Sequence, residues 1–567
     1  MDSTVALWER SRSLPETIAE MDSTRRLVLI LFAFFSIFVA APAAWQSRQS
    51  TLNVTTDVNH QDLLVVPVAA NWPSYNGDYT GRRYSALNDI NAGNVSQLRL
   101  AWVFHPGNSE RVEATPVVVH GIMYVTSAND AFALDARTGR ALWHHARSLS
   151  TGLLDDAAGH KNRGVAAWKN SIYMETDDAH LLCLDARSGG LRWDVAYADK
   201  TKHYGATSVP LIVKGEIIVG TSGGDSGVRG FVAAYDAETG EKKWQLWTIP
   251  GPGEFGSSSW PGDSYLHGGA TTWMPGTYDP ELETLYWTTS NAGPDFVGDT
   301  RPGDDLYTAS VLAIDPDTGK LKWYFQFTPH DLYDYDANET PVLVDLPDHG
   351  AVRHLLLQAN RNGFFYVLDR TNGRFLNASP FVEKLNWAKG IDGSGRPLLS
   401  GRIPTADGTL ICPGIDGATN WFSPSYNPET GFFYVLALES CSVYFSNPKP
   451  FKKGETYYGT GTKLAADNHA QKILLALSVP DGKVVWRYPQ VGRGDSWGGT
   501  LTTAGGLVFF GNDAGYLEAV DARTGHSLWH FNTGQSFRAS PMTYSLAGTQ
   551  HVAIASSSDL LVFSLPH

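Results

Sequence analysis

The stretch Ala133–Trp143, ALDARTGRALW, decides the fold because its pattern returns along the chain. An apolar strand leads into Asp135, a short turn ends at Gly139, and Trp143 follows four residues later. Asp and Gly favour tight turns, whereas apolar and β-branched residues favour the flanking strands. Each copy of the pattern therefore predicts a β-hairpin.

The pattern occurs in eight units. Further full copies end at Trp193, Trp244, Trp323 and Trp529, and degenerate copies are VLDRTNGRFLN around Asp369, VLALES around Leu438 and ALSVPDGKVVW ending at Trp486. Hairpin repeats at intervals of about 50 residues indicate a propeller, and almost nothing in the chain has helical periodicity. We therefore predict an all-β, eight-bladed β-propeller with Trp-containing blade repeats, in which each tryptophan packs flat against the neighbouring blade.

The chain is longer than its repeats require. With 567 residues it exceeds eight minimal blades of roughly 40–50 residues, so long loop insertions are expected between Asp236 and Asp315 and between Asp369 and Leu438. Loops at one end of a propeller are the usual place for chemistry. The segment 71–104 precedes the first full unit, and its last strand, with Trp102, is expected to complete the final blade and close the ring.

The N-terminus has the pattern of an export signal. Arg25 and Arg26 precede the apolar run Leu27–Ala41, which merges into the small residues APAA. A membrane-spanning helix needs roughly 20 apolar residues, so a cleaved leader is favoured over an uncleaved anchor. We expect a signal peptide at 1–43, with Met21 as an alternative start, a linker at 44–70 and the propeller at 71–567. The protein would then be periplasmic or otherwise exported, with membrane contact only if the leader stays attached.

The charge of the chain limits the class of binding partner, and its cysteines limit the possible disulfides and haem sites. The formal net charge is -14, and no basic stripe is present to neutralise phosphates, which argues against a nucleic acid partner. An oxidising compartment permits a disulfide, and Cys412 and Cys441 are the sensible pair because both lie in one loop-rich stretch. Cys183 lies in an apolar strand and is expected to be an inert core residue. The sequence contains no C-x-x-C-H motif and hence no covalent c-type haem site.

The stretch Thr328–Asn338, TPHDLYDYDAN, concentrates negative charge. In an extended backbone, side chains alternate between two faces, so Asp334 and Asp336 would point the same way and repel each other unless a cation lies between them. Asp331 would face the other way and is assigned a structural role in the turn. From the residues alone, the stretch is open to three interpretations: a solvated acidic loop, a general base or a metal site.

Several motifs resemble the PQQ (pyrroloquinoline quinone)-dependent alcohol dehydrogenases. They are the segment 71–104, NRGVA at 162–166, SGVRGF at 226–231, RPGDDLYTAS at 301–310 and TPHD at 328–331, and the resemblance runs from about residue 71 to the C-terminus. That family consists of exported eight-bladed propellers. The resemblance implies an enzyme that oxidises a primary or secondary alcohol and passes electrons to a separate acceptor such as a cytochrome c. The sequence does not fix the oligomeric state, and a homodimer is one of the alternatives.

The resemblance also implies a set of site residues. The metal ligands fall on Asp225, Asn291 and Asp334, and Asp334 is in addition the catalytic base. The cofactor contacts fall on Glu113, Arg163, Thr207, Ser222, Gly223, Gly224, Thr271, Trp273, Arg361, Asn420 and Trp497, and Cys412–Cys441 matches a family disulfide. This set suits PQQ, a planar tricarboxylate, because Trp273 offers an aromatic floor and the two arginines offer charge. A hard cation held by oxygen ligands would act as a Lewis acid on the quinone.

The metal is predicted to be a lanthanide(III) ion, with Ca2+ as the runner-up. Lanthanide-dependent members of the family carry a second Asp two positions after the base, where this chain has Asp336. Three carboxylates (Asp225, Asp334 and Asp336) balance a trivalent ion better than a divalent one. His160 and His267 lack paired spacing and are not expected to bind metal.

Two positions depart from the family pattern. Asp225 stands where the family usually has a ligating Glu, and Ala157-Ala158 stands where many members have a vicinal cysteine pair. Both changes would loosen the hold on a cofactor. They therefore keep an alternative open, in which the chain is a non-catalytic periplasmic propeller that serves as a binding or scaffold module and has lost PQQ.

Overall fold

The computed structural model describes residues 56–107, 111–154, 159–465, 470–492 and 496–566. The expected signal peptide and Ala157-Ala158 lie outside these ranges. The described residues are almost entirely strands, turns and loops, and their α-helix α2 (His60–Leu63) is one turn long. In this part of the chain, no helix is long and apolar enough to cross a membrane. The prediction of an all-β chain is confirmed.

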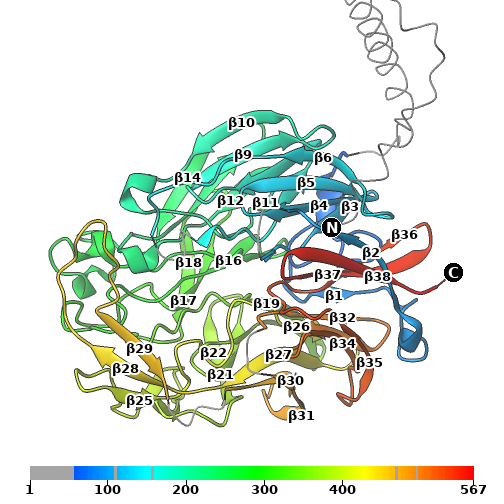
Figure 1. Ribbon diagram of the computed structural model, residues 1–567. Coiled ribbons are helices and arrows are strands. Elements are labelled where there is room, and N and C mark those ends of the chain that lie inside the picture. Colours follow the sequence, from blue (N-terminus) through cyan, green and yellow to red (C-terminus); the bar gives the residue numbers. More distant parts are fainter. Residues whose placement is uncertain (1–55, 108–110, 155–158, 466–469, 493–495, 567) are drawn as a thin grey trace, which may run out of the picture. The chain divides into compact units, whose positions relative to one another are not determined.

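The first five large sheets follow one another in sequence, each with four antiparallel strands (Figure 1). The first sheet contains β3 (Val117–Val119), β4 (Ile122–Ser127), β5 (Asp130–Asp135) and β6 (Ala141–His145), and the second contains β7 (Ala166–Trp168), β8 (Ser171–Glu175), β9 (His180–Asp185) and β10 (Leu191–Ala196). The third contains β11 (Leu211–Val213), β12 (Glu216–Val219), β13 (Phe231–Asp236) and β14 (Lys242–Trp247), and the fourth contains β15 (Thr277–Asp279), β16 (Thr284–Thr288), β17 (Ser310–Ile314) and β18 (Leu321–Gln326). The fifth contains β19 (Val342–Asp348), β20 (Ala351–Ala359), β21 (Phe364–Asp369) and β22 (Arg374–Pro380).

Three more large sheets complete the described fold. They are β26 (Ser425–Asn427), β27 (Phe432–Glu439), β30 (Gln471–Ser478) and β31 (Val484–Pro489); the five-stranded sheet of β1 (Tyr84–Ser85), β32 (Thr500–Thr503), β33 (Leu507–Gly511), β34 (Tyr516–Asp521) and β35 (Ser527–Asn532); and β2 (Arg99–Phe104), β38 (Asp559–Ser564), β37 (Thr549–Ser556) and β36 (Met542–Leu546). Smaller sheets join β23 (Ala388–Ile391) to β24 (Pro397–Leu399), and β25 (Thr409–Ile411) to β28 (Ser442–Ser446) and β29 (Thr460–Leu464).

One assignment of repeats to sheets is wrong. The sequence pattern predicts separate units at Leu438 and Trp486, yet β27 and β30 pair directly, so both units belong to one sheet. The small β28–β29 hairpin is inserted in the sequence between β27 and β30, and it pairs within a different sheet. The last large sheet, which holds β36 to β38, contains no copy of the repeat pattern.

The tryptophans pack against the next repeat, as predicted. A Cβ atom placed on Gly189 would lie only 2.6 Å from Cε3 of Trp143, and the indole Nε1 of Trp143 donates a hydrogen bond to Ala186 O at 2.9 Å. The same relation links Trp193 to Gly240, Trp244 to Gly319, Trp323 to Gly373 and Trp486 to Gly525. Each of these five sheets is thereby packed against the next large sheet along the chain.

The N-terminal segment joins the C-terminal sheet, as predicted from Trp102. Strand β2 pairs antiparallel with β38, with Trp102 opposite Val562, and the blue strand lies beside the red ones in Figure 1. The ring of Trp102 lies against Gly139 of the first repeat, and Trp529 lies 5.6 Å from the ring of Phe563. The last sheet is therefore packed against both the sheet before it in sequence and the first sheet of the chain.

The described part of the expected linker is packed onto the sheets. Val58 is buried and pairs with Lys169, and Asn59 caps helix α2 through its side chain. Val68 forms a bridge with Ser85. Residues 56–70 are therefore part of the folded unit.

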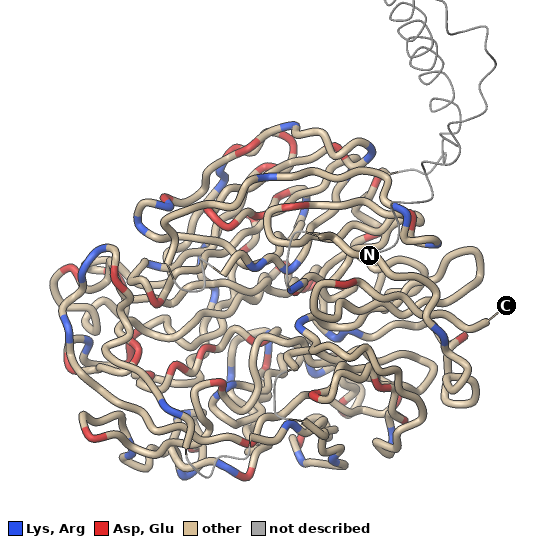
Figure 2. The backbone as a smooth tube through the Cα atoms, in the orientation of Figure 1, with Lys and Arg blue, Asp and Glu red and all other residues tan. Residues whose placement is uncertain are grey.

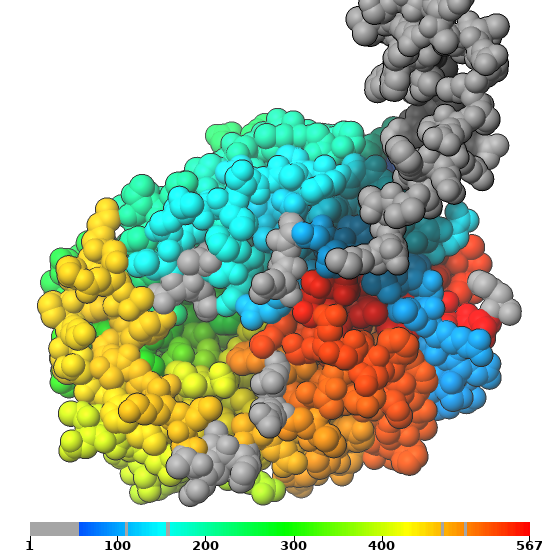
Figure 3. Space-filling model, in the orientation of Figure 1, coloured from blue at the N-terminus to red at the C-terminus, as the bar shows by residue number. Residues whose placement is uncertain are grey.

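Long loops collect beside the sheets and bring distant segments together. The connection between β28 and β29 reaches across to the loop after β12, where Tyr457 N donates to Asp225 O at 2.6 Å. Figure 3 shows a hollowed part of the surface where cyan, green, yellow and orange segments of the chain meet. Basic and acidic residues are interspersed along the described backbone (Figure 2).

Candidate active site

A cavity of about 280 Å³ lies where the loops between strands meet. All the residues that the sequence assigns to a metal ion or to the cofactor line it: Glu113, Arg163, Thr207, Ser222, Gly223, Gly224, Asp225, Thr271, Trp273, Asn291, Asp334, Asp336, Arg361, Asn420 and Trp497. These residues come from segments that are hundreds of positions apart, so the fold alone brings them together.

The two aspartates of the acidic stretch converge on one guanidinium. Arg361 Nη1 lies 2.7 Å from Asp336 Oδ2, and Arg361 Nη2 lies 3.3 Å from Asp334 Oδ2. Asp336 Oδ1 also accepts a hydrogen bond from the backbone N–H of Asn291 at 2.7 Å. The backbone is not regularly extended here, because Asp334 has a φ of 61°. The two side chains therefore share the cavity through this turn and Arg361, rather than through strand alternation.

Asp331 supports the turn and does not line the cavity. Its Oδ1 accepts from Tyr333 N at 3.0 Å and its Oδ2 from Tyr335 N at 2.9 Å. The side chain is fully buried, and burial raises the pKa of Asp331 to about 6. These contacts fit the structural role that the sequence suggested.

Asp225 reaches the same end of the cavity from a tight turn, η5 (Gly224–Ser226). The preceding Gly223 has a φ of +102°, and a Cβ atom there would collide with His203 O, so the close approach requires glycine. Burial raises the pKa of Asp334 well above its usual range, the charges of Asp336 and Asp225 act in the same direction, and Arg361 opposes them. This end of the cavity is therefore an acidic pocket in which carboxylates repel one another.

An aromatic and cationic wall forms another part of the cavity. Arg163 Nη2 lies 2.9 Å from Glu113 Oε2, and Arg163 Nη1 donates to Thr207 O at 2.6 Å. Its guanidinium carbon lies 4.3 Å from the ring centroid of Trp421 and 5.3 Å from that of Trp273. Among the described residues, Arg163 Nε and Ser222 Oγ are buried and have no hydrogen-bond partner. Buried donors of this kind suit a polar, planar ligand.

Asn338, a residue to which the sequence gave no role, forms a hydrogen bond with the indole of Trp273. With its side-chain amide oriented to satisfy both neighbours, Asn338 accepts a hydrogen bond from Trp273 Nε1 at 2.5 Å and donates one to Thr288 O at 3.0 Å. Asn338 lies two residues after Asp336 and so links the acidic stretch to the aromatic ring.

Seven lining residues were missed from the sequence: Arg111, Lys161, Ser290, Ile415, Asp416, Trp421 and Arg538. Ser290 precedes the predicted site residue Asn291, and Trp421 follows the predicted site residue Asn420. Their position next to predicted site residues could therefore have identified them from the sequence. Arg538 had no such signal, since it enters the cavity from the loop before β36, where its guanidinium carbon lies 5.6 Å from the ring centroid of Trp497.

The two histidines that were set aside have other contacts. His160 Nδ1 lies 3.0 Å from Asp177 Oδ2, and His267 stacks on Phe451 with ring centroids 3.5 Å apart. Within the described ranges, no group of three or more His, Cys, Asp or Glu side chains lies ready to hold a metal ion. Asp334 and Asp336 each place one carboxylate oxygen, Oδ2, on Arg361.

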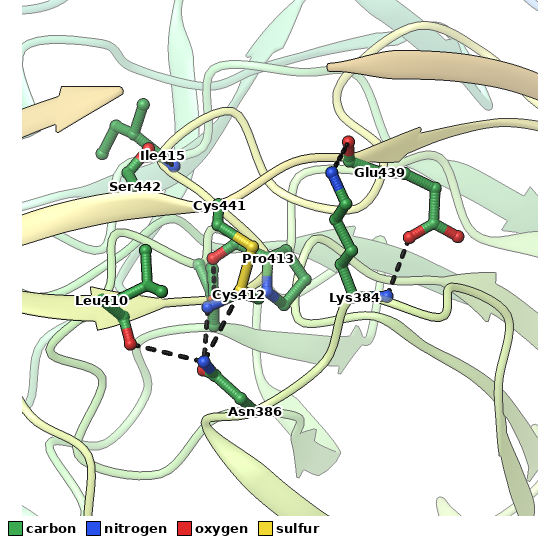
Figure 4. Close-up of a disulfide and its surroundings, with 10 residues drawn as sticks. Lys384, Asn386, Leu410, Cys412, Pro413, Ile415, Glu439, Cys441 and Ser442 are labelled. Atoms are coloured by element: carbon green, nitrogen blue, oxygen red, sulfur yellow. Dashed lines mark hydrogen bonds between the residues drawn. A yellow bond between two sulfur atoms is a disulfide. The ribbon is translucent and has the colours of Figure 1, made fainter. Parts of the chain in front are cut away.

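The disulfide Cys412–Cys441 is present, as predicted, with the sulfur atoms 2.02 Å apart (Figure 4). It closes the loop that carries Ile415, whose carbonyl oxygen accepts from Arg361 Nη2 at 2.8 Å. The next residue after Cys412, Pro413, accepts from the hydroxyl of Tyr335 at 2.6 Å. The third cysteine, Cys183, is buried in β9, and burial raises its pKa. The disulfide thus supports the loop that helps to hold Arg361.

Comparison with known proteins places the chain in a family. The family model described as "Glucose/ethanol/alcohol dehydrogenase, beta-propeller domain", a PQQ family, matches residues 72–384 and 489–552. The quinoprotein alcohol dehydrogenase PedH of Pseudomonas putida is 37% identical over 88% of this chain and 88% of its own length. The quinohemoprotein alcohol dehydrogenase ADH IIB of Pseudomonas putida is 40% identical over 85% of this chain and 73% of its own length.

A solved structure agrees with these matches in fold. The structure titled "Europium-containing methanol dehydrogenase" superposes with a TM-score of 0.81 at 32% sequence identity, over 88% of this chain and 98% of that one. The resemblance inferred from the motifs is confirmed by the family model, the sequence relatives and this neighbour together. The chain belongs to the PQQ-dependent quinoprotein alcohol dehydrogenases and is an oxidoreductase that acts on alcohols.

Proposed function

We propose that this enzyme oxidises a primary or secondary alcohol to an aldehyde or ketone, with PQQ and one metal ion in the cavity and Asp334 as the base. The observation that carries the proposal is the meeting of an acidic end, around Asp334 and Asp336, with an aromatic and cationic wall, around Trp273 and Arg163, in one cavity. The electrons would leave to a separate carrier, such as a cytochrome c.

The residues present fit both groups. A planar tricarboxylate suits the ring of Trp273, the guanidinium of Arg163 and the unpartnered donors Arg163 Nε and Ser222 Oγ. Carboxylate oxygens and an amide oxygen, at Asp225, Asp334, Asp336 and Asn291, are the donors that hard cations prefer. Burial raises the pKa of Asp334, repulsion from the neighbouring carboxylates raises it further, and a cation at this end would relieve that repulsion.

The chain's own residues then have defined tasks. When bound, PQQ supplies a two-electron acceptor and the metal ion supplies a Lewis acid. Asp334 would accept the proton of the alcohol hydroxyl as the general base. Arg361 holds the carboxylate of Asp334 in place, and the hydrogen bond from Asn291 N to Asp336 fixes the loop beside it.

The proposal predicts how the purified protein behaves on reconstitution. Full-length protein supplied with PQQ and with La3+ or Ca2+ should retain the cofactor's absorbance and reduce an artificial dye when given an alcohol. Asp334→Asn should lower kcat by roughly 100-fold or more, because general-base catalysis contributes about 10²–10⁴-fold. The control Arg370→Lys alters a buried ion pair between the turn after β21 and Asp279 of β15, and Arg370 lies outside the cavity lining. Absence of PQQ binding with every metal would overturn the proposal and leave the scaffold alternative.

The metal assignment is part of the proposal. Lanthanide(III) is favoured over Ca2+ because Asp225, Asp334 and Asp336 bring three carboxylates to one end, and similarity to a europium-containing methanol dehydrogenase supports this choice. Asp336→Ala should shift the ratio of La3+-supported to Ca2+-supported activity toward Ca2+ by about tenfold or more. A ratio equal to that of the wild type would contradict the role given to Asp336.

Two further proposals concern the whole protein. The large sheets, seven of four strands and one of five among the described residues, would be the eight blades of a closed ring, supported by the contacts of Trp102 and Trp529. The leader-like segment and the Cys412–Cys441 disulfide support export to the periplasm or beyond the cell. Fractionation of the native host with an antibody against the mature chain tests the location.

A further inference from the structure

Asp295 is a buried carboxylate close to the acidic end of the cavity that has no assigned role. It follows Asn291 by four positions in the loop between β16 and β17, and only 2% of it is exposed. Arg301 and Gly268 hold this loop: Arg301 Nη2 donates to Pro294 O at 3.1 Å, and Gly293 N donates to Gly268 O at 3.0 Å. The loop that carries the predicted ligand Asn291 therefore also fixes Asp295 in the interior.

The side chain of Asp295 has an unused acceptor. Its Oδ1 atom is buried and has no hydrogen-bond partner among the described residues. Arg301 is nearby, but it makes its ion pair with Asp305 and donates its other hydrogen bonds to the carbonyl oxygens of Asp331 and Pro294. A buried carboxylate oxygen without a donor is costly, and proteins keep such groups mainly where a cation or a partner compensates them.

The electrostatic neighbours of Asp295 are the predicted metal ligands. After burial itself, the charges of Asp225, Asp334 and Asp336 raise the pKa of Asp295 well above its usual range, and the charge of Arg301 opposes them. Asp225 has the largest effect of the three. Asp295 is thus electrostatically part of the same acidic group, although it comes from a different loop and is not one of the residues that line the cavity.

We propose that Asp295 is a further oxygen ligand of the metal ion, reached from the loop that also supplies Asn291. This inference rests on the proposed function, since it concerns the ion assigned to Asp225, Asn291, Asp334 and Asp336. This role would explain why the chain can have Asp225 where the family usually has the longer glutamate. The carboxylate of Asp295 would supply the oxygen ligand that the glutamate supplies in other members. A fourth carboxylate also favours a trivalent over a divalent cation, because the attraction grows with the charge of the ion.

Terbium luminescence tests the coordination directly, without turnover. Full-length protein with PQQ is titrated with Tb3+, and emission lifetimes in H2O and D2O count the water molecules bound to the ion. Asp295→Leu, whose side chain has the same branched arrangement of heavy atoms but no oxygen ligand, should bind one more water and bind Tb3+ about 10–100-fold more weakly. Asp295→Asn, which keeps an oxygen, should gain no water but lose affinity for Tb3+ by a larger factor than for Ca2+.

The matched control is Asp416→Leu, which removes a carboxylate from the cavity lining that is not among the named charges acting on Asp295. It should leave the number of bound waters unchanged. Thermal unfolding without metal checks the fold: Asp295→Leu should be no less stable than the wild type, because it removes a buried polar atom that has no hydrogen-bond partner. If Asp295→Leu does not fold, the affinity ratio of Asp295→Asn for Tb3+ and Ca2+ decides the question.

The outcomes separate this inference from the proposed function. Wild-type protein that binds Tb3+ and PQQ while Asp295→Leu shows the same hydration and affinity would overturn the role of Asp295 and leave the proposed function intact. Wild-type protein that binds neither would overturn both. A gain of one water with weaker binding, confined to Asp295→Leu, would establish Asp295 as a ligand.

Discussion

Arg361 and Asp336 form a buried ion pair in which Nη1 lies 2.7 Å from Oδ2, and the same guanidinium also reaches Asp334 and Ile415 O. The sequence assigned Arg361 to the cofactor and the aspartates to the metal. In the structure, one side chain holds both carboxylates and the disulfide-bonded loop. The acidic end of the cavity and the disulfide-bonded loop are therefore mechanically connected.

Arg361→Lys should disconnect them. A single ammonium cannot span two carboxylates and a carbonyl oxygen as the planar guanidinium does. We expect kcat/KM for dye-linked alcohol oxidation to fall by about 10–100-fold and PQQ to be retained less well. Arg370→Lys is the matched control, because Arg370 is also buried and pairs with two carboxylates, Asp279 at 2.6 Å and Asp345 at 2.7 Å. An equal loss of kcat/KM in both variants would show that Arg361 acts only through stability.

Removing the disulfide should loosen the same connection. The Cys412→Ser/Cys441→Ser variant frees a loop with a sequence separation of 29, and chain entropy predicts a loss of about 3–4 kcal/mol in the free energy of unfolding. Because Ile415 lies in this loop and accepts from Arg361, PQQ retention should fall as well. Thermal unfolding and cofactor absorbance after gel filtration measure the two effects. Cys183→Ala removes a buried thiol that forms no crosslink, and it should leave PQQ retention unchanged.

The tryptophan–glycine contact between sheets makes a separate prediction about stability. Gly189 has a φ of +70° and lies against Trp143, whereas Gly431 has the same φ of +70° and has nothing within 4 Å of the position of a Cβ atom. Alanine at either position should cost about 1–2 kcal/mol for the left-handed backbone. Gly189→Ala should cost a further 1–3 kcal/mol or so, because the new methyl group displaces the indole. Thermal unfolding of both variants measures the difference, and equal midpoints would refute the packing argument.

The sequence predicted the features that depend on local chemistry. Turn residues and the tryptophan four positions after each glycine revealed the hairpins, and Trp102 revealed the closing strand β2. The units at Leu438 and Trp486 were separated wrongly, because the return of β30 to pair with β27 after an inserted hairpin is a tertiary event that no local periodicity records. Asn377 was recognisable only as a break in the pattern, yet it donates to Asp481 O at 3.0 Å, much as the tryptophans reach the next repeat.

The candidate site shows the same division. Residues inside recognisable motifs were found, and they share one cavity. Arg538 and Asp295 were missed, since only the folded chain brings them near Trp497 and Asp225. The alternation argument for Asp334 and Asp336 assumed an extended backbone, whereas the positive φ of Asp334 turns the chain there. The two carboxylates meet because of the turn and Arg361.

A last prediction concerns pH and a carboxylate away from the cavity. Glu175 in β8 is buried, and burial raises its pKa from 4.5 to about 8, while the hydrogen bond from Tyr197, at 2.7 Å, acts in the opposite direction. Between these two pH values the folded protein holds a proton that the unfolded chain has released. The free energy of unfolding should therefore fall as pH rises through this window.

Glu175→Gln removes this proton linkage. Relative to the wild type, the variant should gain stability as the pH is raised from 5 to 8.5, by on the order of 4 kcal/mol at the upper end, since each pKa unit is worth about 1.4 kcal/mol. Denaturant unfolding at several pH values measures the difference. Asp407→Asn, at an exposed position, is the control and should follow the wild-type curve. A constant difference between Glu175→Gln and wild type across this range would mean that Glu175 does not exchange a proton on unfolding.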